Sequence, residues 1–146
     1  MKNSAKKKIT KKKSPKTLAK EKAWRYFSKY IRLRDCDAHT EIGKCFTCNK
    51  PHHYKQMQAG HFIHNTSATY FDEMNVNAQC VRCNYYLGGA GAKYRKHLIK
   101  KYGKTGVEAL EERAKPGTVF KISDYNEIAE IYKTKVKQEV EKEFYE

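Results

Sequence analysis

The clearest pattern near the start of the chain is an amphipathic helix over Ala23–Arg34. Aromatic and aliphatic side chains recur there at helical spacing, so Trp24, Phe27 and the neighbours Tyr30 and Ile31 share one face. Basic residues occupy the other faces of this segment. We interpret the aromatic stripe as core packing rather than as a surface that stacks on bases.

Two more helices are predicted in the second half of the chain, separated from the first by a long turn-rich region. Residues 35–84 carry few helix signals, and the glycine-rich residues 88–92 predict a flexible break. Lys93–Tyr102 predicts a very basic helix that ends at Gly103. Val107–Ala114 predicts a short helix that ends near Pro116.

The pattern predicts a last helix that begins with Ser123 as its N-terminal cap and runs to about Phe144. Its apolar positions are Ile128, Ile131, Tyr132, Val136 and Val140. This face either packs on its own domain or joins two copies of the chain, and a homodimer is expected in the second case.

The charge of the chain indicates a polyanionic partner. Its 146 residues include 31 Lys plus Arg and 16 Asp plus Glu, a formal net charge of +15. Nucleic acid and anionic membrane are both partners that such a positive charge would attract. No stretch approaches the roughly 20 apolar residues of a spanning helix, and the start lacks the apolar core of a signal peptide. We therefore expect a cytoplasmic protein that binds nucleic acid and no membrane.

Residues 1–22 predict a disordered basic tail. They hold ten lysines and one acid and cannot bury a core. The tail is either a solubilising segment or an arm that neutralises phosphates. Counting this arm and the basic helices, the expected DNA contacts are Lys6, Lys7, Lys8, Lys11, Lys12, Lys13, Arg25, Arg32, Arg34, Lys93, Arg95, Lys96, Lys100 and Lys101.

Four cysteines predict a structural zinc site. Cys45 and Cys48 form one Cys-x-x-Cys pair, and Cys80 and Cys83 form another. Two such pairs complete the tetrahedral shell of four thiolates that structural zinc prefers, and a reducing compartment favours metal over disulfides. Cys36 lies nine residues before the first pair and is expected to be a free thiol.

The segment between the cysteine pairs and the residue after them contain candidates for phosphodiester hydrolysis. His61 is a candidate general base, because imidazole titrates near neutral pH. Asn84 directly follows the last cysteine, and its amide oxygen is a hard ligand for Mg²⁺ or a similar ion. Asn75 is a candidate to hydrogen-bond the backbone that positions the histidine.

The order Cys-x-x-Cys, His61, Asn75, Cys-x-x-Cys-Asn84 resembles the HNH endonucleases with a ββα-metal core. The resemblance implies that His61 activates water, Asn75 braces the loop and Asn84 binds a catalytic Mg²⁺ or Mn²⁺. One position departs from the family pattern, because Gly60 stands where many HNH enzymes carry an aspartate ligand. His64, Asp72 and His61 itself are the alternatives for the second ligand.

Several longer motifs are similar to the NinG (Rap) family of lambdoid phages over residues 23–115. They are Cys-Phe-Thr-Cys at 45–48, Ala-Gly-His-Phe at 59–62, Asn-Val-Asn-Ala-Gln-Cys-Val-Arg-Cys-Asn at 75–84 and Tyr-Arg-Lys-His-Leu at 94–98. This resemblance implies a phage-encoded recombination endonuclease in a bacterial host, acting on displacement loops and four-way junctions.

The expected fold is α+β, with a small zinc-stabilised ββα-metal core flanked by helices. Its expected parts are the tail 1–22, an HNH-like zinc nuclease domain over 23–115 and a C-terminal helix over 116–146. The alternative function is a non-catalytic zinc-containing protein that binds DNA or RNA. His61 together with Asn84 favours the enzyme, because a protein that only binds has no need of a base beside a metal ligand.

Overall fold

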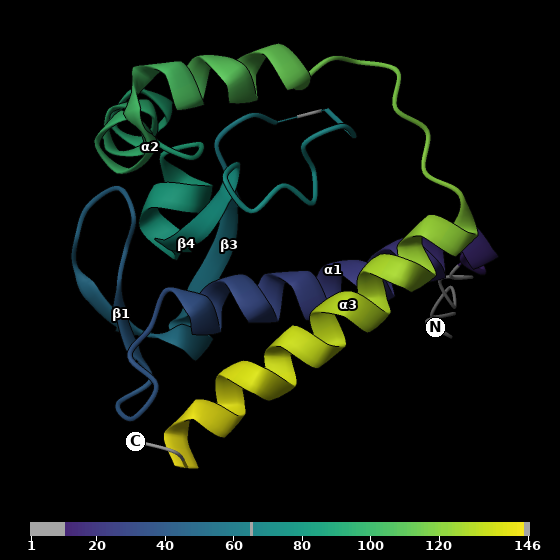
Figure 1. The fold of residues 1–146 in the computed structure, drawn as a ribbon, viewed down its shortest axis with the longest axis horizontal. Helices are drawn as coiled ribbons and strands as arrows, with labels where there is room; N and C mark the ends of the chain where they lie inside the picture. Colours follow the sequence, from purple (N-terminus) through teal and green to yellow (C-terminus); the bar gives the residue numbers. More distant parts are fainter. Residues whose placement is uncertain (1–10, 65, 145–146) are drawn as a thin grey trace, which may run out of the picture.

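The computed structural model describes residues 11–64 and 66–144. Its three long helices are α1 (Pro15–Arg34), α2 (Gly91–Arg113) and α3 (Ile122–Glu141). Helices α1 and α3 lie side by side on one side of the molecule, and α2 lies on the opposite side (Figure 1). Within the described residues, no helix is both long and apolar enough to cross a lipid bilayer.

Two small antiparallel sheets lie between these helices. Strand β3 (Met57–His61) pairs with β4 (Val76–Cys80), and β1 (Ile42–Lys44) pairs with β2 (Pro51–His53). The β3–β4 hairpin contacts α1 (Figure 1), and all five residues of β4 are buried. The architecture is therefore α+β, as predicted.

Short helical segments complete the chain. They are η1 (Tyr54–Gln56), the π-helical η2 (Arg82–Tyr86) and η3 (Lys142–Phe144). The short π-helical turn η2 begins one residue after β4 ends, so the order along the chain is β3, β4 and η2.

Helix α1 begins at Pro15, so the predicted disordered tail over 1–22 is wrong for residues 15–22. Ser14 caps the helix by accepting a hydrogen bond from the Thr17 backbone N–H at 3.1 Å. Ala19 and Ala23 are buried against α3. Sequence reasoning missed this narrow apolar stripe because it relied on charge, and lysines surround the two alanines.

The other helix boundaries also differ in detail from the prediction. Gly103 has φ 77° and ψ 160° and kinks α2, so the two predicted helices follow one another without a loop. The glycine-rich break is a turn at Gly88–Ala90, where all three residues have positive φ, and residues 91 and 92 already belong to α2. The first residue of α3 is Ile122, and Asp124 accepts the Lys121 N–H at 2.6 Å, so Ser123 is not the cap.

The apolar face of α3 packs on its own domain. Tyr132 and Val136 join Phe27, Tyr30 and Ile31 of α1 in one core cluster. Two of the predicted face residues are instead solvent-exposed, namely Ile131 and Val140. The helix buries Tyr125 and Ala129 in their place, because its contact with α1 follows a slightly different stripe.

Glu73 ties the helix pair to the loop before β4. Its carboxylate accepts hydrogen bonds from Tyr132 Oη at 2.9 Å and Tyr30 Oη at 3.2 Å, and it pairs with Lys135. Burial opposes the ionised form, but the hydrogen bonds from Lys135 and Tyr132 outweigh it and lower the pKa of Glu73. The charged carboxylate thus fixes β4 against both helices.

Candidate functional site

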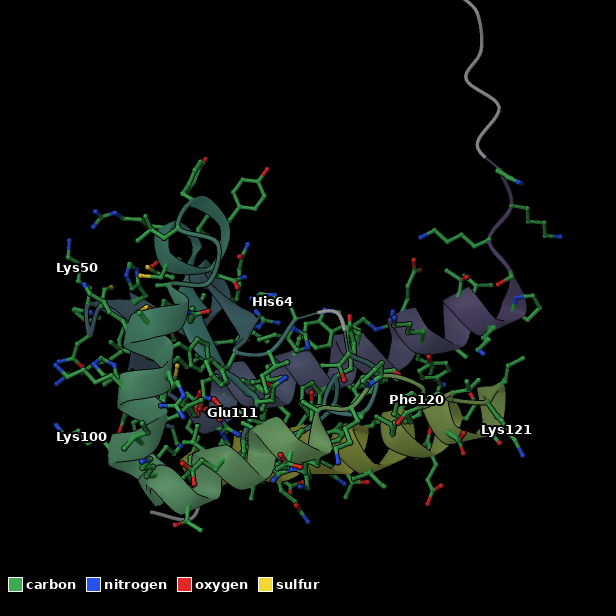
Figure 2. The ribbon with its side chains drawn as sticks, turned by 90° about the horizontal axis from the view of Figure 1, so that it is seen from above. Lys50, His64, Lys100, Glu111, Phe120 and Lys121 are labelled. Carbon is green, nitrogen blue, oxygen red and sulfur yellow. The ribbon has the colours of Figure 1, made fainter. Side chains whose placement is uncertain are left out.

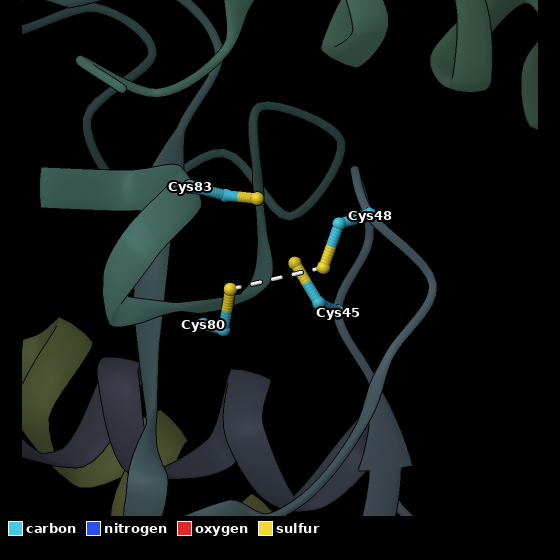
Figure 3. A group of neighbouring side chains, drawn as sticks. All are labelled: Cys45, Cys48, Cys80 and Cys83. Carbon is cyan, nitrogen blue, oxygen red and sulfur yellow. Dashed lines mark hydrogen bonds between the residues drawn. The ribbon is translucent and has the colours of Figure 1, made fainter. Parts of the chain in front are cut away.

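The four predicted zinc ligands meet at one point. The Sγ atoms of Cys45, Cys48, Cys80 and Cys83 all lie within 4.8 Å of one another (Figure 3), and those of Cys48 and Cys80 are 3.8 Å apart. A tetrahedral zinc ion with thiolates at about 2.3 Å requires sulfur–sulfur separations of about 3.8 Å. The cluster therefore fits zinc, and Cys36 lies outside it.

Local backbone geometry builds each half of the cluster. The Asn49 N–H donates to the Cys45 carbonyl at 2.8 Å, and Asn49 adopts a positive φ of 62°, which closes the first knuckle. The Phe46 N–H donates to the Ala78 carbonyl at 2.9 Å and so attaches this knuckle to β4. Cys80 is the last residue of β4, and the second knuckle continues into η2.

The electrostatics of the cluster favour a cation. Burial raises the pKa of the Cys83 thiol to about 12. Burial acts on Cys45 in the same direction, but hydrogen bonds from the Cys48 backbone and the Thr47 side chain outweigh it and lower the pKa of Cys45 to about 6. The Cys45 thiolate therefore forms readily at neutral pH, while burial raises the pKa of Cys80 and Cys83, so binding of a metal at these thiols would release protons.

His61 is the last residue of β3 and is oriented as a neutral imidazole. Its Nε2 lies 2.9 Å from the Tyr70 carbonyl oxygen, which only accepts, so Nε2 carries the proton and Nδ1 keeps a lone pair. The ring stacks on Trp24 with centroids 5.1 Å apart. Burial lowers the pKa of His61, and the hydrogen bond to Tyr70 only partly opposes it. This arrangement suits a general base.

Asn75 makes the contacts that its predicted bracing role requires. It is fully buried, and its Oδ1 accepts the Ile63 N–H at 2.8 Å. Its Nδ2 donates to the carbonyls of Ile63 at 3.1 Å and Thr69 at 3.0 Å. These bonds hold both ends of the segment that leaves β3 directly after His61.

Two amide oxygens converge on Gly60, the residue before His61. A Cβ added to Gly60 would lie 1.9 Å from Gln79 Oε1 and 2.8 Å from Asn84 Oδ1. Side chains alternate along a strand, so this oxygen pair and the His61 ring flank opposite faces of the end of β3. The space that a side chain at position 60 would need is thus occupied by the side-chain oxygen of Gln79.

Hydrogen bonds fix the orientation of both amides. Gln79 Nε2 donates to Thr47 Oγ1 at 3.1 Å and to the Gly89 carbonyl at 3.0 Å. Asn84 Nδ2 donates to Gln58 Oε1 at 2.8 Å. Since the nitrogens face acceptors, the two oxygens are the atoms that point toward Gly60.

Gln79 Oε1 is an orphaned acceptor. The side chain is fully buried, and in the part of the chain that the structure describes no donor lies within hydrogen-bond distance of this oxygen. An unsatisfied buried polar group costs about 1–3 kcal/mol, so such atoms usually face an ion or an ordered water. An amide oxygen is a hard donor, so Gln79 Oε1 and Asn84 Oδ1 are of the chemical type that could contribute to binding Mg²⁺ or Mn²⁺, although neither carries a charge.

The other two candidate ligands, His64 and Asp72, differ in their surroundings. The ring of His64 is 6.4 Å from that of His61, and its Nε2 would lie 3.0 Å from a Cβ on Gly89. Asp72 pairs with Arg113 at 2.7 Å and accepts the backbone N–H of Met74 at 2.9 Å. The carboxylate of Asp72 is therefore already engaged in holding the loop to α2.

The predicted DNA contacts fall into three groups. Residues 6–8 lie outside the described residues, whereas Lys11, Lys12, Arg25, Lys93, Lys96, Lys100 and Lys101 are exposed. Lys13 and Arg95 are surface residues paired with Glu21 and Glu111. In Figure 2, Lys50 and Lys100 lie at the same end of the molecule, away from Lys121.

Arg34 is not free to contact DNA, which corrects that prediction. Its guanidinium pairs with Asp35 at 2.7 Å and donates to the carbonyls of Glu73 and Val76, and only 17% of the side chain is exposed. Arg32 is half-buried over the ring of Tyr54. Both arginines lie at the C-terminal end of α1, where they join it to the loops.

Sequence reasoning missed four residues at this site. Gln79 was hidden because a lone glutamine carries no motif signal. Tyr70 supplies the carbonyl that orients His61, and any residue can supply a carbonyl. Tyr85 and Tyr86 are exposed directly after Asn84, although an aromatic pair beside a metal-binding knuckle was a visible signal.

Comparisons with known proteins point to one family. A family model described as "Bacteriophage Lambda NinG protein" matches residues 1–143. "Protein ninG" of Escherichia phage 933W is 34% identical over 84 residues, which cover 56% of this chain and 39% of that protein. The proteins of the same name from Salmonella phage P22 and Escherichia phage lambda are 34% and 33% identical over 84 residues.

The extent of these matches is limited on the relatives' side. The aligned segment covers 56% of this chain but only 38% of the P22 and lambda proteins, so the chain spans about two fifths of the length of the relatives it matches. No solved structure matches this chain.

Proposed function

The chain belongs to the NinG family of phage proteins, and from this membership and the geometry around His61 we propose that it is a metal-dependent, HNH-like endonuclease for branched DNA. Its substrates are displacement loops and four-way junctions. The observation that carries the proposal is an oriented neutral imidazole at the end of β3 together with two amide oxygens that converge on Gly60, of which Gln79 Oε1 has no hydrogen-bond donor among the described residues.

Each residue has a defined part in the reaction. Nδ1 of His61 accepts a proton from the attacking water, and the Tyr70 carbonyl stabilises the imidazolium through Nε2–H. Gln79 and Asn84 would hold a divalent ion through their amide oxygens. A bound Mg²⁺ or Mn²⁺ supplies Lewis-acid stabilisation of the charge that develops on the phosphate. Because His61 ends β3, a phosphodiester laid across that end would meet both groups.

Preference for branched DNA follows from the distribution of charge. Exposed lysines and arginines occur on α1 and α2, and the chain contains no helix-turn-helix signature or tandem two-Cys-two-His fingers. Phosphate contacts position a protein without reading sequence, and the shape of the DNA supplies the remaining discrimination. Diverging arms of a junction present backbones to several positive surfaces at once.

The test of the activity is cleavage of labelled four-way junctions, displacement loops and linear duplexes of matched sequence. Zinc-loaded protein is incubated with Mg²⁺, Mn²⁺ or a chelator selective for these ions. We expect metal-dependent cutting of the branched forms, lost in His61→Ala and retained in His53→Ala, a matched histidine control on β2. Tight binding with no cutting under any metal would support the second candidate, a zinc protein that only binds nucleic acid.

The ion site is tested apart from activity. Binding of Mn²⁺ to zinc-loaded protein is followed by the electron paramagnetic resonance signal of free Mn²⁺. Gln79→Met and Asn84→Leu remove one oxygen each with little change in volume, and each should weaken Mn²⁺ binding while zinc content stays at one ion per chain. Unchanged Mn²⁺ affinity in both variants would mean that an ordered water, not an ion, satisfies Gln79.

A further inference from the structure

Two tyrosines are exposed at the turn that follows the second cysteine knuckle. Tyr85 and Tyr86 are 73% and 75% exposed, and the neighbouring Leu87 is 51% exposed. The two rings contact each other edge to face, with centroids 5.2 Å apart. Three consecutive exposed apolar side chains do not contribute to the core, and such patches usually mark a binding surface.

The turn that carries these rings is rigidly attached. The Leu87 N–H donates to the Arg82 carbonyl at 2.9 Å, which closes a π-helical turn. The Gly89 N–H donates to the carbonyl of Cys83, a member of the metal cluster, also at 2.9 Å. π-Helical turns are frequent at functional sites, and tyrosine loses little conformational entropy on binding. The backbone that carries the two rings is therefore fixed without a partner.

The charge of this region identifies the chemistry of the partner. Residues 74–107 contain seven basic residues and no acidic residue. Six of the basic side chains are exposed, namely Arg82, Lys93, Lys96, Lys100, Lys101 and Lys104. A polyanion with flat aromatic faces satisfies both features, and nucleic acid has this combination. Single-stranded nucleic acid binds to such surfaces by stacking its bases on aromatic side chains while basic residues follow the backbone.

We propose that Tyr85 and Tyr86 form an aromatic wedge that stacks on unpaired bases at a DNA branch point. This inference rests on the proposed DNA substrate. A linear duplex keeps its bases stacked inside the helix, so the wedge finds a partner only where strands separate. Asn84, a proposed ligand of the divalent ion, directly precedes Tyr85 in η2. Stacking on the branch thus sets the distance between the branch point and the phosphate that is cut.

The experiment uses full-length zinc-loaded protein and DNA with the fluorescent base 2-aminopurine at the branch point. Wild-type protein should change the fluorescence of this base in a four-way junction and not in a linear duplex. In the double variant Tyr85→Ala/Tyr86→Ala, the change should disappear and junction affinity should fall about tenfold or more. Affinity for linear duplex should stay the same, because the phosphate contacts remain.

Two controls separate stacking from other effects. Tyr85→Phe/Tyr86→Phe keeps both ring faces and should bind junctions like the wild type. Val119→Ala removes an exposed apolar side chain, 76% exposed, from the connection between α2 and α3, and should have no effect. Zinc content and circular dichroism establish that each variant is folded.

Three results would overturn the wedge. They are unchanged junction preference in the double alanine variant, equal loss of affinity for linear duplex, or sedimentation showing that the tyrosines join two copies of the chain instead. Failure of the nuclease proposal looks different, since wild-type protein would then bind junctions and alter 2-aminopurine fluorescence without cutting in any metal.

Discussion

Alanine at position 60 should destabilise the protein, because Gln79 already fills the space that a side chain there would need. The new Cβ would lie 1.9 Å from Gln79 Oε1, so the glutamine must move. Moving it breaks the hydrogen bonds from Nε2 to Thr47 and to the Gly89 carbonyl, all inside a buried environment. Each buried partner left unpaired costs about 1–3 kcal/mol, so Gly60→Ala should lower the free energy of unfolding by about 2–4 kcal/mol.

The second arm of this experiment removes the glutamine. Gln79→Ala alone removes the donor to the Gly89 carbonyl and leaves Thr47 Oγ1 with its contact to Cys45 Sγ, and it should also cost about 2–4 kcal/mol. In that background the clash with Gln79 is gone and only Asn84 Oδ1, 2.8 Å from the new Cβ, has to shift, so Gly60→Ala should cost less than it does in the wild type. The two costs should therefore fail to add, with a coupling energy of about 1–3 kcal/mol, as is typical of residues in direct contact.

The free energies come from urea unfolding of zinc-loaded protein, followed by circular dichroism. Gly91→Ala is the matched control, because a Cβ there meets no atom within 4 Å and the residue is already helical. It should be neutral or slightly stabilising. The reasoning is refuted if Gly60→Ala lies within about 0.5 kcal/mol of wild type, or if the costs of the two substitutions simply add.

Three further predictions concern the metal, the base and the tail. Cys45→Ser should lose zinc and unfold the region around β3 and β4, because a structural zinc contributes on the order of 10 kcal/mol to the free energy of folding. Full zinc content of this variant by metal analysis would contradict the prediction. The lowered pKa of His61 keeps the base neutral to more acidic pH, so the acidic limb of the kcat/KM profile should have its midpoint below the ordinary 6.5, whereas a midpoint above it would exclude this role. Deleting residues 1–13 removes seven lysines but keeps Ser14, the cap of α1. The slope of log affinity for DNA against log salt concentration should then flatten by about 0.9 per lost phosphate contact. An unchanged slope would mean that the tail does not touch DNA.

The sequence was most informative where a pattern maps onto one physical requirement. Paired cysteines locate the metal cluster, because four thiolates at that spacing have few other uses. Helical periodicity locates the face of α1 that carries Phe27 and Ile31, and both are fully buried. Gly103 ends a helix in the sequence and kinks α2 in the structure, because its positive φ of 77° suits glycine.

The sequence was least informative where a residue acts through its surroundings. Gln79 can point its side-chain oxygen toward Gly60 because glycine has no side chain there. The two residues are nineteen positions apart in the sequence, and only the register of β3 and β4 brings them near each other. The start of α1 was hidden because Ala19 and Ala23 form a weak apolar signal among lysines. Arg34 has the charge of a DNA contact, and only its contacts with Asp35 and the neighbouring carbonyls show that it is structural.

The metal cluster and the proposed active site depend on the same short stretch of backbone. Gln79 precedes Cys80, and its amide donates to Thr47, which lies between Cys45 and Cys48. Asn84 follows Cys83 in η2, and the tyrosine pair follows Asn84. Each proposed contact with ion or DNA on this side of β3 is therefore within one to three residues of a zinc ligand. A chain with so many lysines and so small a core would gain rigidity from a metal bound by the four cysteines, where a larger protein would use packing. The cysteine cluster would thus hold the proposed ion ligands and the proposed wedge at fixed positions relative to His61.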